Sequence, residues 1–442
     1  MGNPENTDFI EITLKRKLDS LDSENGFDFR STDYLLYPLK ERYPLYYTDL
    51  IDRYVGLPFN DSSYVVSMTF QKEKFYHELY KKKYSPHLNE EREAQHYLND
   101  TANLVKGSYK HLLNVLSSFQ NGKHKLIVDA DNDGSFNNNE TMVFDRGYEF
   151  KNNMYPDQIA LDTLPIIEVS YQISQRGKVI DLNRKVQIFP YPNYFYMQLY
   201  QEEDLKKHGL LLRLKDYWEG SINLDNTGYN FKAQGLSDTK IDFYIKPDSV
   251  RDYRNNTALN LNFRYEMHDT VLLSDNFYTI DSLILSPPKI FLNKINSKKE
   301  NKVGSRMGYI LPDYTFTDIE NKEFSIRDLG NKKYVLLDFW GTWCQPCLKL
   351  IPRLKRMESQ YKEKLNILGI AYNDSLESLL KFKSDNNIKW RQVYFKGKKG
   401  IIGDLKIPAF PTYVLLEKNG KIIYIGSAEE GLKTIDSLIS GH

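Results

Sequence analysis

Two cysteines three positions apart carry the clearest chemistry in the sequence. Cys344 and Cys347 lie in residues 339–347 (FWGTWCQPC), and the chain of 442 residues contains no other cysteine. If this segment turns from a strand into a helix, the Cys344 thiol stands at the helix N-terminus, where unpaired N–H groups and the helix dipole stabilise a thiolate. A thiol one turn later can attack a mixed disulfide and release the product. The spacing therefore predicts Cys344 as the nucleophile and Cys347 as the resolving thiol.

There are two other interpretations of such a cysteine pair. The cysteines could supply two of the four ligands of a zinc site, or they could be unreactive thiols in the hydrophobic core. A structural zinc site needs four ligands, usually from Cys and His. No histidine lies between Tyr309 and Ser440, so zinc would need ligands from elsewhere in the chain. A disulfide scaffold cannot be built from two cysteines. Redox chemistry is therefore the favoured interpretation.

A second motif fits a twelve-residue calcium loop. Residues 129–140 (DADNDGSFNNNE) have carboxylates at positions 1, 3, 5 and 12 and a glycine at position 6. These are the oxygen ligands and the turn residue that a hard cation requires. The expected ligands are Asp129, Asp131, Asp133, the carbonyl of Ser135, and Glu140. Both flanks are β-prone, so we expect the calcium ion to stabilise a β-hairpin. The alternative is a solvated turn without metal.

The composition excludes several classes of protein. The formal net charge of +1 gives no reason to expect a nucleic-acid partner. No run of about 20 apolar residues occurs and the mean hydropathy is −0.57, so we expect no membrane-spanning helix. No phosphate loop, nucleotide fingerprint or Ser/His/Asp array is visible, and no organic cofactor is expected. Hydrophobic residues at 40% and charged residues at 27% are typical of a globular protein.

The elements that must position the cysteines form an α/β pattern. Residues 334–339 (YVLLDF) are a continuous apolar run, typical of a buried parallel strand, and a helix is expected over 347–361. A strand at 365–372, a helix at 375–386, strands at 411–417 and 421–426, and a final helix at 430–440 should follow. Lys418-Asn419-Gly420 predicts a hairpin between the last two strands. The C-terminal part is thus expected to be an α/β sandwich.

The region from 27 to 300 has mainly strand patterns. Short β-prone runs between Gly, Asn, Asp and Pro predict strands. The runs are 64–70, 125–128, 166–172, 185–189, 240–245 and 259–265. A helical insert is expected over 90–119, where apolar residues recur at near-helical spacing.

The chain is therefore expected to be multidomain: a β-rich N-terminal region over 27–300 that could divide near 165, then an α/β unit over 301–442. Residues 301–442 carry a formal charge of +7, and the preceding 300 residues carry −6. The polar residues 1–26 are expected to be a disordered or leader-proximal segment. They lack the pattern of a signal peptide, and Met1-Gly2 suggests that a native leader has been removed.

Four features around the cysteines together resemble the thioredoxin superfamily. Besides the CxxC motif, Asp338 lies six residues before Cys344, Pro352 lies five residues after Cys347, and residues 410–412 (FPT) are similar to the family's cis-proline loop. The resemblance covers about residues 305–440. Within the superfamily, residues 311–316 (LPDYTF), the lead-in WGTWC and an insertion at 375–393 are most similar to TlpA/ResA-type extracytoplasmic reductases. Many of these carry an acidic residue where this chain has Asn373-Asp374.

The resemblance implies roles for several neighbours of the cysteines. Asp338, if buried without a charged partner, would have a raised pKa and could accept the proton of Cys347; a purely hydrogen-bonding role is the alternative. Pro411, if cis, would present adjacent backbone to an extended substrate strand. Trp343 and Phe410 are expected at the substrate rim.

The expected function is a thiol-disulfide oxidoreductase with a redox-active Cys344–Cys347 disulfide, acting on disulfide-bearing proteins. No cation between the cysteines over-stabilises the thiolate, so we expect a reducing couple. The resemblance implies a periplasmic or cell-envelope setting, either free or with a lipid anchor, and a membrane thiol electron donor. The alternatives are a partner- or glycan-binding protein with an auxiliary redox unit, and a thiol peroxidase.

Overall fold

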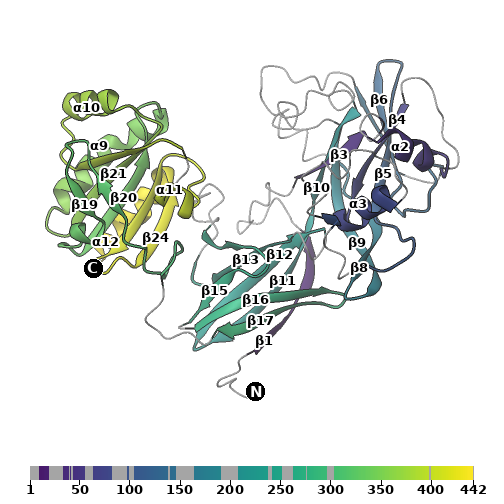
Figure 1. The fold of residues 1–442 in the computed structure, drawn as a ribbon, viewed down its shortest axis with the longest axis horizontal. Helices are drawn as coiled ribbons and strands as arrows, with labels where there is room; N and C mark the ends of the chain where they lie inside the picture. Colours follow the sequence, from purple (N-terminus) through teal and green to yellow (C-terminus); the bar gives the residue numbers. More distant parts are fainter. Residues whose placement is uncertain are drawn as a thin grey trace.

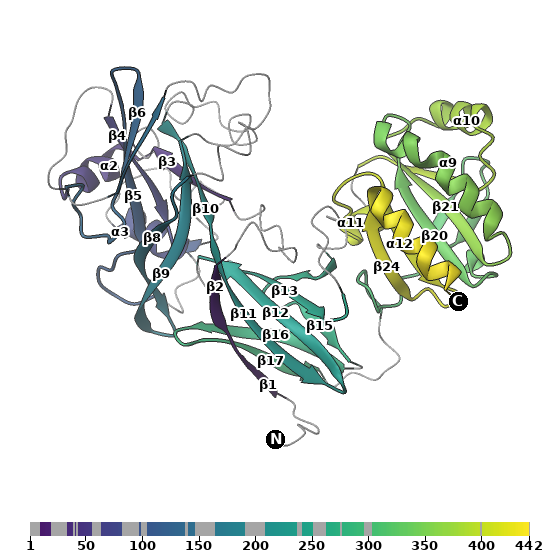
Figure 2. The ribbon, with the colours of Figure 1, turned by 180° about the vertical axis from the view of Figure 1, so that it is seen from behind.

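The chain forms three bodies in a row (Figures 1 and 2). An eight-stranded sheet with two helices lies at one end, two smaller sheets lie in the middle, and an α/β unit lies at the other end. The N-terminal region is therefore β-rich and the C-terminal region is α/β, as the sequence predicted. The computed structural model describes residues 9–18, 33–38, 40, 43–54, 63–81, 97–98, 104–137, 140–145, 164–190, 208–236, 241–250, 262–274, 276–295, 303–397 and 400–441.

The eight-stranded sheet is antiparallel, with the strand order β7-β6-β5-β4-β3-β10-β9-β8. Its strands are β3 (Asp33–Pro38), β4 (Ser63–Thr69), β5 (Leu112–Gln120), β6 (Lys123–Val128), β7 (Glu140–Asp145), β8 (Ile167–Gln175), β9 (Lys178–Phe189) and β10 (Leu210–Leu214). The helices α2 (Pro44–Ile51) and α3 (Lys72–Lys81) pack on one face, against Val65, Leu116 and Ile127. The other face belongs to the main hydrophobic core.

The helix expected over 90–119 is wrong in its described second half, where Leu112–Gln120 form β5. This strand is buried on both faces, because Leu116 packs under the helices and Val115 lies in the main core. A strand covered on both faces carries a continuous apolar run, which spacing cannot distinguish from a buried helix. Most of the first half lies outside the described residues.

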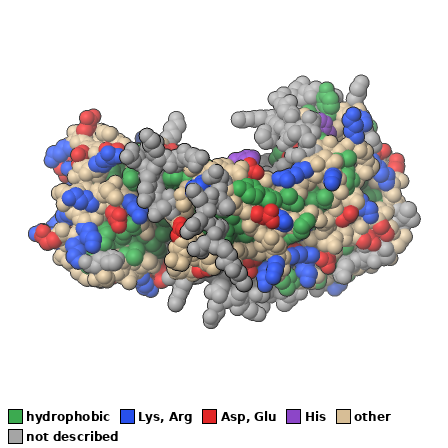
Figure 3. All heavy atoms as spheres, turned by 90° about the horizontal axis from the view of Figure 1, so that it is seen from below, with side chains coloured by type: hydrophobic (Ala, Val, Ile, Leu, Met, Phe, Trp, Pro, Cys, Tyr) green, Lys and Arg blue, Asp and Glu red, His purple; other side chains and the backbone are tan. Residues whose placement is uncertain are grey.

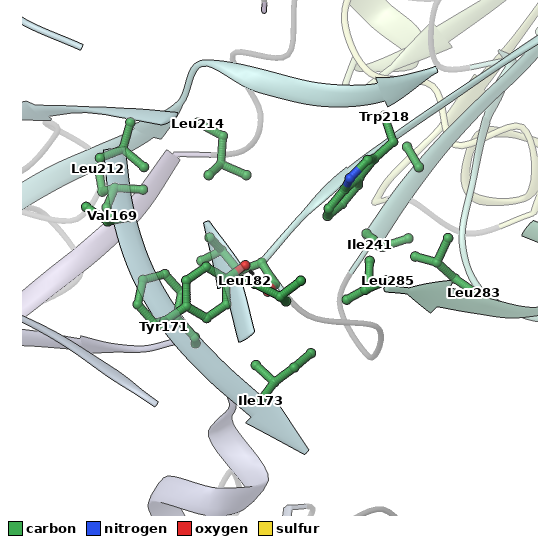
Figure 4. Packing of buried hydrophobic residues seen from close by; sticks show 14 of the residues in the cluster. Val169, Tyr171, Ile173, Leu182, Leu212, Leu214, Trp218, Ile241, Leu283 and Leu285 are labelled. Carbon is green, nitrogen blue, oxygen red and sulfur yellow. Dashed lines mark hydrogen bonds between the residues drawn. The ribbon is translucent and has the colours of Figure 1, made fainter. Parts of the chain in front are cut away.

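Two smaller sheets form the middle body, in the orders β1-β17-β16-β15 and β14-β13-β12-β11-β2. Their strands are β1 (Phe9–Thr13), β2 (Lys15–Leu18), β11 (Asp216–Leu224), β12 (Thr227–Gly235), β13 (Ile241–Pro247), β14 (Arg264–Tyr265), β15 (Thr270–Leu273), β16 (Asn276–Leu285) and β17 (Pro288–Ile295). Their buried side chains share one core with the eight-stranded sheet. Figure 4 shows this continuity, with Tyr171 and Leu212 on one side and Trp218 and Leu283 on the other.

The expectation of a disordered segment over 1–26 is wrong for residues 9–18. β1 pairs with β17, and β2 pairs with β11. Ile10 and Ile12 alternate with exposed residues and are buried in the main core, so this short stretch has the period of a half-buried strand. Residues 1–8 and 19–26 lie outside the described part of the chain.

Strands from both sides of residue 165 share the eight-stranded sheet, because β3 pairs with β10. The eight-stranded sheet therefore does not divide near residue 165, the boundary that the sequence leaves open. The strands expected at 64–70, 125–128, 166–172 and 185–189 are confirmed as β4, β6, β8 and β9. The strand at 240–245 is confirmed as β13. Of the one at 259–265, residues 264–265 form β14, residues 262–263 are not in a strand, and residues 259–261 lie outside the described part of the chain.

The C-terminal unit is built on a five-stranded sheet in the order β22-β21-β20-β23-β24, in which β22, β21 and β20 are parallel and β23 runs antiparallel to both of its neighbours, β20 and β24. A small hairpin, β18 (Thr315–Thr317) and β19 (Glu323–Ser325), precedes it. The main elements are β20 (Tyr334–Trp340), α9 (Gln345–Gln360), β21 (Leu365–Tyr372), α10 (Leu376–Asp385), β22 (Arg391–Phe395), α11 (Ile401–Asp404), β23 (Thr412–Glu417), β24 (Ile422–Ser427) and α12 (Ala428–Ser440). Each expected strand and helix of this unit is confirmed to within a few residues.

Helices α9 and α12 cover one face of this sheet, where Leu336, Leu354 and Ile435 are buried together. The opposite face carries a second cluster that includes Leu337 and Ile401 of α11. Successive residues of β20 alternate between the two clusters, as the pleat of a strand requires. A polar residue in β20 is therefore enclosed in protein on whichever face it lies.

Residues 303–311 connect the middle body to the C-terminal unit and bond to both. The backbone of Tyr309 pairs with Ile422 of β24, and Leu311 pairs with Gly420. Arg306 donates hydrogen bonds to the carbonyl oxygens of Asn262 and Arg264, at 3.0 and 2.5 Å, and forms an ion pair with Asp269. The segment is thus a structural element that both the middle body and the C-terminal unit share.

The surface carries both signs of charge. On the face shown in Figure 3, Lys and Arg side chains are interspersed with Asp and Glu side chains. Apolar side chains also reach this surface between the charged ones. This mixed distribution agrees with the near-zero formal net charge.

Candidate functional site

The two cysteines lie where β20 passes into α9. Cys344 is the residue that caps α9, and its Sγ accepts a hydrogen bond from the backbone N–H of Cys347 at 3.3 Å. The two sulfurs form a disulfide, with the Cα atoms 5.3 Å apart. Both side chains are buried in a small cluster with Trp340. The structure therefore places the pair at a helix N-terminus, in the oxidised state of a dithiol centre.

The loop before the cysteines is held by Asp374. Its buried carboxylate accepts hydrogen bonds from the backbone N–H and the hydroxyl of Thr342, at 2.6 and 2.7 Å. Trp343 donates from Nε1 to the carbonyl oxygen of Tyr372 at 2.8 Å. Sequence spacing could not assign Asp374 a role, because its partner is 32 residues earlier and the contact depends on how β20 and β21 align.

Aromatic side chains form the rim beside the disulfide. Trp343 is 51% exposed, and its ring meets Phe410 edge to face with centroids 5.6 Å apart. Phe410 also stacks on Tyr372 at 5.0 Å and packs against the cluster that contains both cysteines. The Phe410–Pro411 peptide bond is cis, and Pro411 is buried. The structure thus brings together Cys344, Cys347 and both predicted rim residues.

Asp338 lies in β20 on the face covered by α9 and α12, between Leu336 and Trp340 along that face. Its side chain is 1% exposed, and neither carboxylate oxygen has a hydrogen-bond partner among the described residues. Burial raises the pKa of Asp338 to about 8, because the charged form loses its hydration. The carboxyl group can therefore exchange a proton near neutral pH.

The Asp129 loop lies in the eight-stranded sheet, between β6 and β7. Asp129 is buried, and its carboxylate accepts hydrogen bonds from Tyr54 Oη at 2.7 Å and from the backbone N–H of Asp133 at 3.0 Å. One carboxylate oxygen from each of Asp129, Asp131 and Asp133 lies within 4.8 Å of the others. Burial raises the pKa of Asp129. The backbone of Glu140 pairs with Val128, and its side chain lies outside the described part of the chain.

Comparison with known proteins places the C-terminal unit in a family. A family model described as thioredoxin-like matches residues 331–422. The thiol-disulfide oxidoreductase ResA of Bacillus cereus is 33% identical over 124 residues, which are 28% of this chain and 70% of that protein. The chain belongs to the thioredoxin-like thiol-disulfide oxidoreductases.

Other relatives match the same share of the chain. The thioredoxin-like protein YneN of Bacillus subtilis is 30% identical over 136 residues, which are 30% of this chain and 77% of that protein. Among solved structures, the thioredoxin domain of a thiol-disulfide oxidoreductase from Bacteroides vulgatus is 26% identical. The match covers 30% of this chain and 97% of that domain, with a TM-score of 0.28. As a family member, this protein is a thioredoxin-like oxidoreductase.

Proposed function

We propose that this protein reduces disulfide bonds of other proteins through Cys344-Gln345-Pro346-Cys347, within a catalytic unit over residues 301–442. The observation that carries the proposal is the Cys344–Cys347 disulfide at the N-terminus of α9, beside an aromatic rim. A helix N-terminus stabilises the thiolate that starts the exchange. The half-exposed Trp343 offers an apolar contact for a polypeptide bearing the target disulfide.

The reaction would proceed in two exchanges from the reduced enzyme. The Cys344 thiolate attacks one sulfur of the substrate, forming a mixed disulfide and releasing the other sulfur as a thiolate. Cys347 then gives its proton to Asp338, and its thiolate attacks the Cys344 sulfur. The Cys344–Cys347 bond forms, and the second substrate sulfur leaves with the electron pair. Two electrons pass to the substrate, and the enzyme ends in the disulfide form described above.

The direction of exchange is proposed from the residues around the cysteines. Gln345 and Pro346 place no positive charge beside the Cys344 sulfur, so the reduced form gains no extra stabilisation from a neighbouring cation. Such a couple favours reduction of the substrate. We further propose an extracytoplasmic setting with a membrane thiol donor that returns the enzyme to its dithiol form. No helix in the described ranges is long and apolar enough to cross a membrane.

Turnover of insulin disulfides by the full chain tests the proposal. We expect the parent to reduce insulin with a small dithiol as electron source, and Cys344→Ser to abolish the activity. Cys347→Ser should instead accumulate mixed disulfides with its substrates, because resolution stops. Equal insulin reduction by the parent and Cys344→Ser would contradict the proposal. Faster turnover with hydrogen peroxide than with protein disulfides would favour a thiol peroxidase.

We also propose that the Asp129 loop binds one calcium ion. Support comes from three carboxylates that converge within 4.8 Å and from Gly134 at the loop position where φ is +82°. The proposed ligands are the carboxylates of Asp129, Asp131, Asp133 and Glu140 and the backbone carbonyl of Ser135. The ion would stabilise the hairpin between β6 and β7 and take no part in disulfide exchange.

A further inference from the structure

Asp338 and two residues on the neighbouring elements carry buried polar atoms without a hydrogen-bond partner among the described residues. They are the two carboxylate oxygens of Asp338, the hydroxyl of Tyr413 and Nε of Arg353. They come from β20, β23 and α9. Buried polar groups in folded proteins are paired in the great majority of cases, so a group of unpaired ones calls for a functional or structural reason.

Tyr413 lies directly opposite Asp338 in the antiparallel pair of β20 and β23. Both side chains project to the α9 and α12 face, since Leu336 and Leu415, two residues away on each strand, are buried there. Directly opposite residues have Cβ atoms about 5 Å apart. The Tyr413 ring also lies under α12, because a Cβ placed on Gly431 would stand 3.4 Å from its Cδ2. The two side chains therefore leave the sheet side by side on this face, with no hydrogen bond between them in this structure.

Arg353 lies between α9 and α12 at the outer end of this polar group. Its Nη2 is 3.3 Å from Asp436, and its Nη1 is 3.9 Å from Glu429. The exposed fraction of the side chain is 20% for Arg353, 34% for Asp436 and 62% for Glu429. The exposed fraction of these polar side chains therefore increases from the buried carboxyl group of Asp338 to the protein surface.

The pKa of Tyr413 responds to both charged neighbours, whereas burial alone raises the pKa of Asp338. Burial is the main reason why the pKa of Tyr413 is raised; the negative charge of Asp338 raises it further, and Arg353 lowers it. The Tyr413 hydroxyl therefore stays protonated, and so remains a donor, at every pH where Asp338 titrates. On the other side of β20, β21 places Gly369 opposite Asp338, and the space over Gly369 is filled by the side chain of Gln392, whose Oε1 accepts a hydrogen bond from Trp340 Nε1 at 3.0 Å. The other titratable groups packed on this face are Cys347 of α9, Tyr334 of β20, Tyr361 and Tyr424.

We propose that Tyr413 and Arg353 are positioning residues for proton transfer from Cys347: the Tyr413 hydroxyl donates a hydrogen bond to the Asp338 carboxylate when it ionises, and Arg353 offsets its negative charge. This inference rests on the proposed function. In the resolving step the Cys347 S–H bond breaks and its proton passes to a carboxylate oxygen of Asp338. The resulting thiolate forms the bond to Cys344, and the substrate sulfur leaves with the electron pair.

The test follows the two thiols separately in the reduced full chain. Dithiobis(nitrobenzoate) releases one coloured thiolate when Cys344 attacks it and a second when Cys347 resolves the mixed disulfide. Stopped-flow absorbance across pH therefore gives one profile for each step. We expect Tyr413→Phe to move the acid limb of the second step upward by about one to two pH units, the effect of losing a hydrogen bond to a charged group. The second step at pH 7 should slow by about tenfold or more, and the first step should be unchanged.

Matched variants separate the possible outcomes. Tyr334→Phe removes a hydroxyl from the same face, four residues from Asp338, and should leave both profiles unchanged. Arg353→Gln should shift the acid limb of the second step's pH profile in the same direction as Tyr413→Phe. Asp338→Asn should remove this acid limb. An unshifted limb in both Tyr413→Phe and Arg353→Gln would overturn the inference. An unchanged profile in Asp338→Asn would overturn it as well, whereas failure of the parent to reduce insulin would refute only the proposed function.

Discussion

Replacing Asp338 by Asn should abolish a loss of stability that the catalytic unit of the parent undergoes as the pH rises. The pKa of Asp338 is about 8 in the folded chain and about 3.9 in an unfolded one. Between these values the folded state binds the proton and the unfolded state does not, so parent stability falls as pH rises from about 4 to 8. Each unit corresponds to about 1.36 kcal/mol, which gives a loss of about 4 kcal/mol by pH 7. This loss is a large fraction of the roughly 5–15 kcal/mol that stabilises a domain.

Urea unfolding of the parent and Asp338→Asn at several pH values measures this effect. Three of the four tryptophans, Trp340, Trp343 and Trp390, lie in the catalytic unit, so tryptophan fluorescence mainly reports its unfolding. The Asn amide stays buried without partners at a cost that does not depend on pH. The informative quantity is therefore the difference in unfolding free energy between variant and parent, which should grow up to about pH 8 and then level off.

The matched control is Asp385→Asn, which changes an exposed carboxyl on α10. This variant should follow the parent at every pH. Parallel stability curves for the parent and Asp338→Asn would refute the reasoning, because they would mean that the buried carboxyl ionises at an ordinary pH.

Three further predictions concern other parts of the chain. Asp374→Ala removes both hydrogen bonds to Thr342, so it should lower the stability of the catalytic unit by about 2–4 kcal/mol and slow the first step with dithiobis(nitrobenzoate); an unchanged first step would argue against a role in holding the loop. A calcium chelator should lower the melting temperature of the parent but not of Asp131→Ala, since an ion that binds only the folded state adds stability; equal melting with and without chelator would leave the loop a solvated turn. Arg306→Ala should speed hydrogen exchange in the backbone around Asp269, measured by mass spectrometry. Unchanged exchange there would show that the contacts of Arg306 contribute little to the stability of this region.

The local chemistry of the catalytic unit was predictable because it depends on short spacings. The cysteine spacing, the apolar run before it and the Asn419-Gly420 turn each specify their structure within a few residues. The contact of Asp374 with Thr342 and the position of Tyr413 opposite Asp338 were not predictable, since they depend on how distant strands align. The spacing of the apolar residues in β5 predicts a helix, because burial of both faces of a strand is a tertiary property that no local pattern records.

The pairing of β1 with β17 also has a consequence for how the chain matures. Ile10 and Leu292, which lie opposite each other, are separated by most of the N-terminal region. When a chain emerges N-terminus first, from a ribosome or through a membrane pore, β1 has no partner until residues 288–295 have also emerged. Until then its two isoleucines remain uncovered, and an unpaired strand with apolar side chains is a template for aggregation. β1 therefore needs protection, for example by a chaperone, until β17 has emerged, and the middle body closes shortly before the cysteines follow.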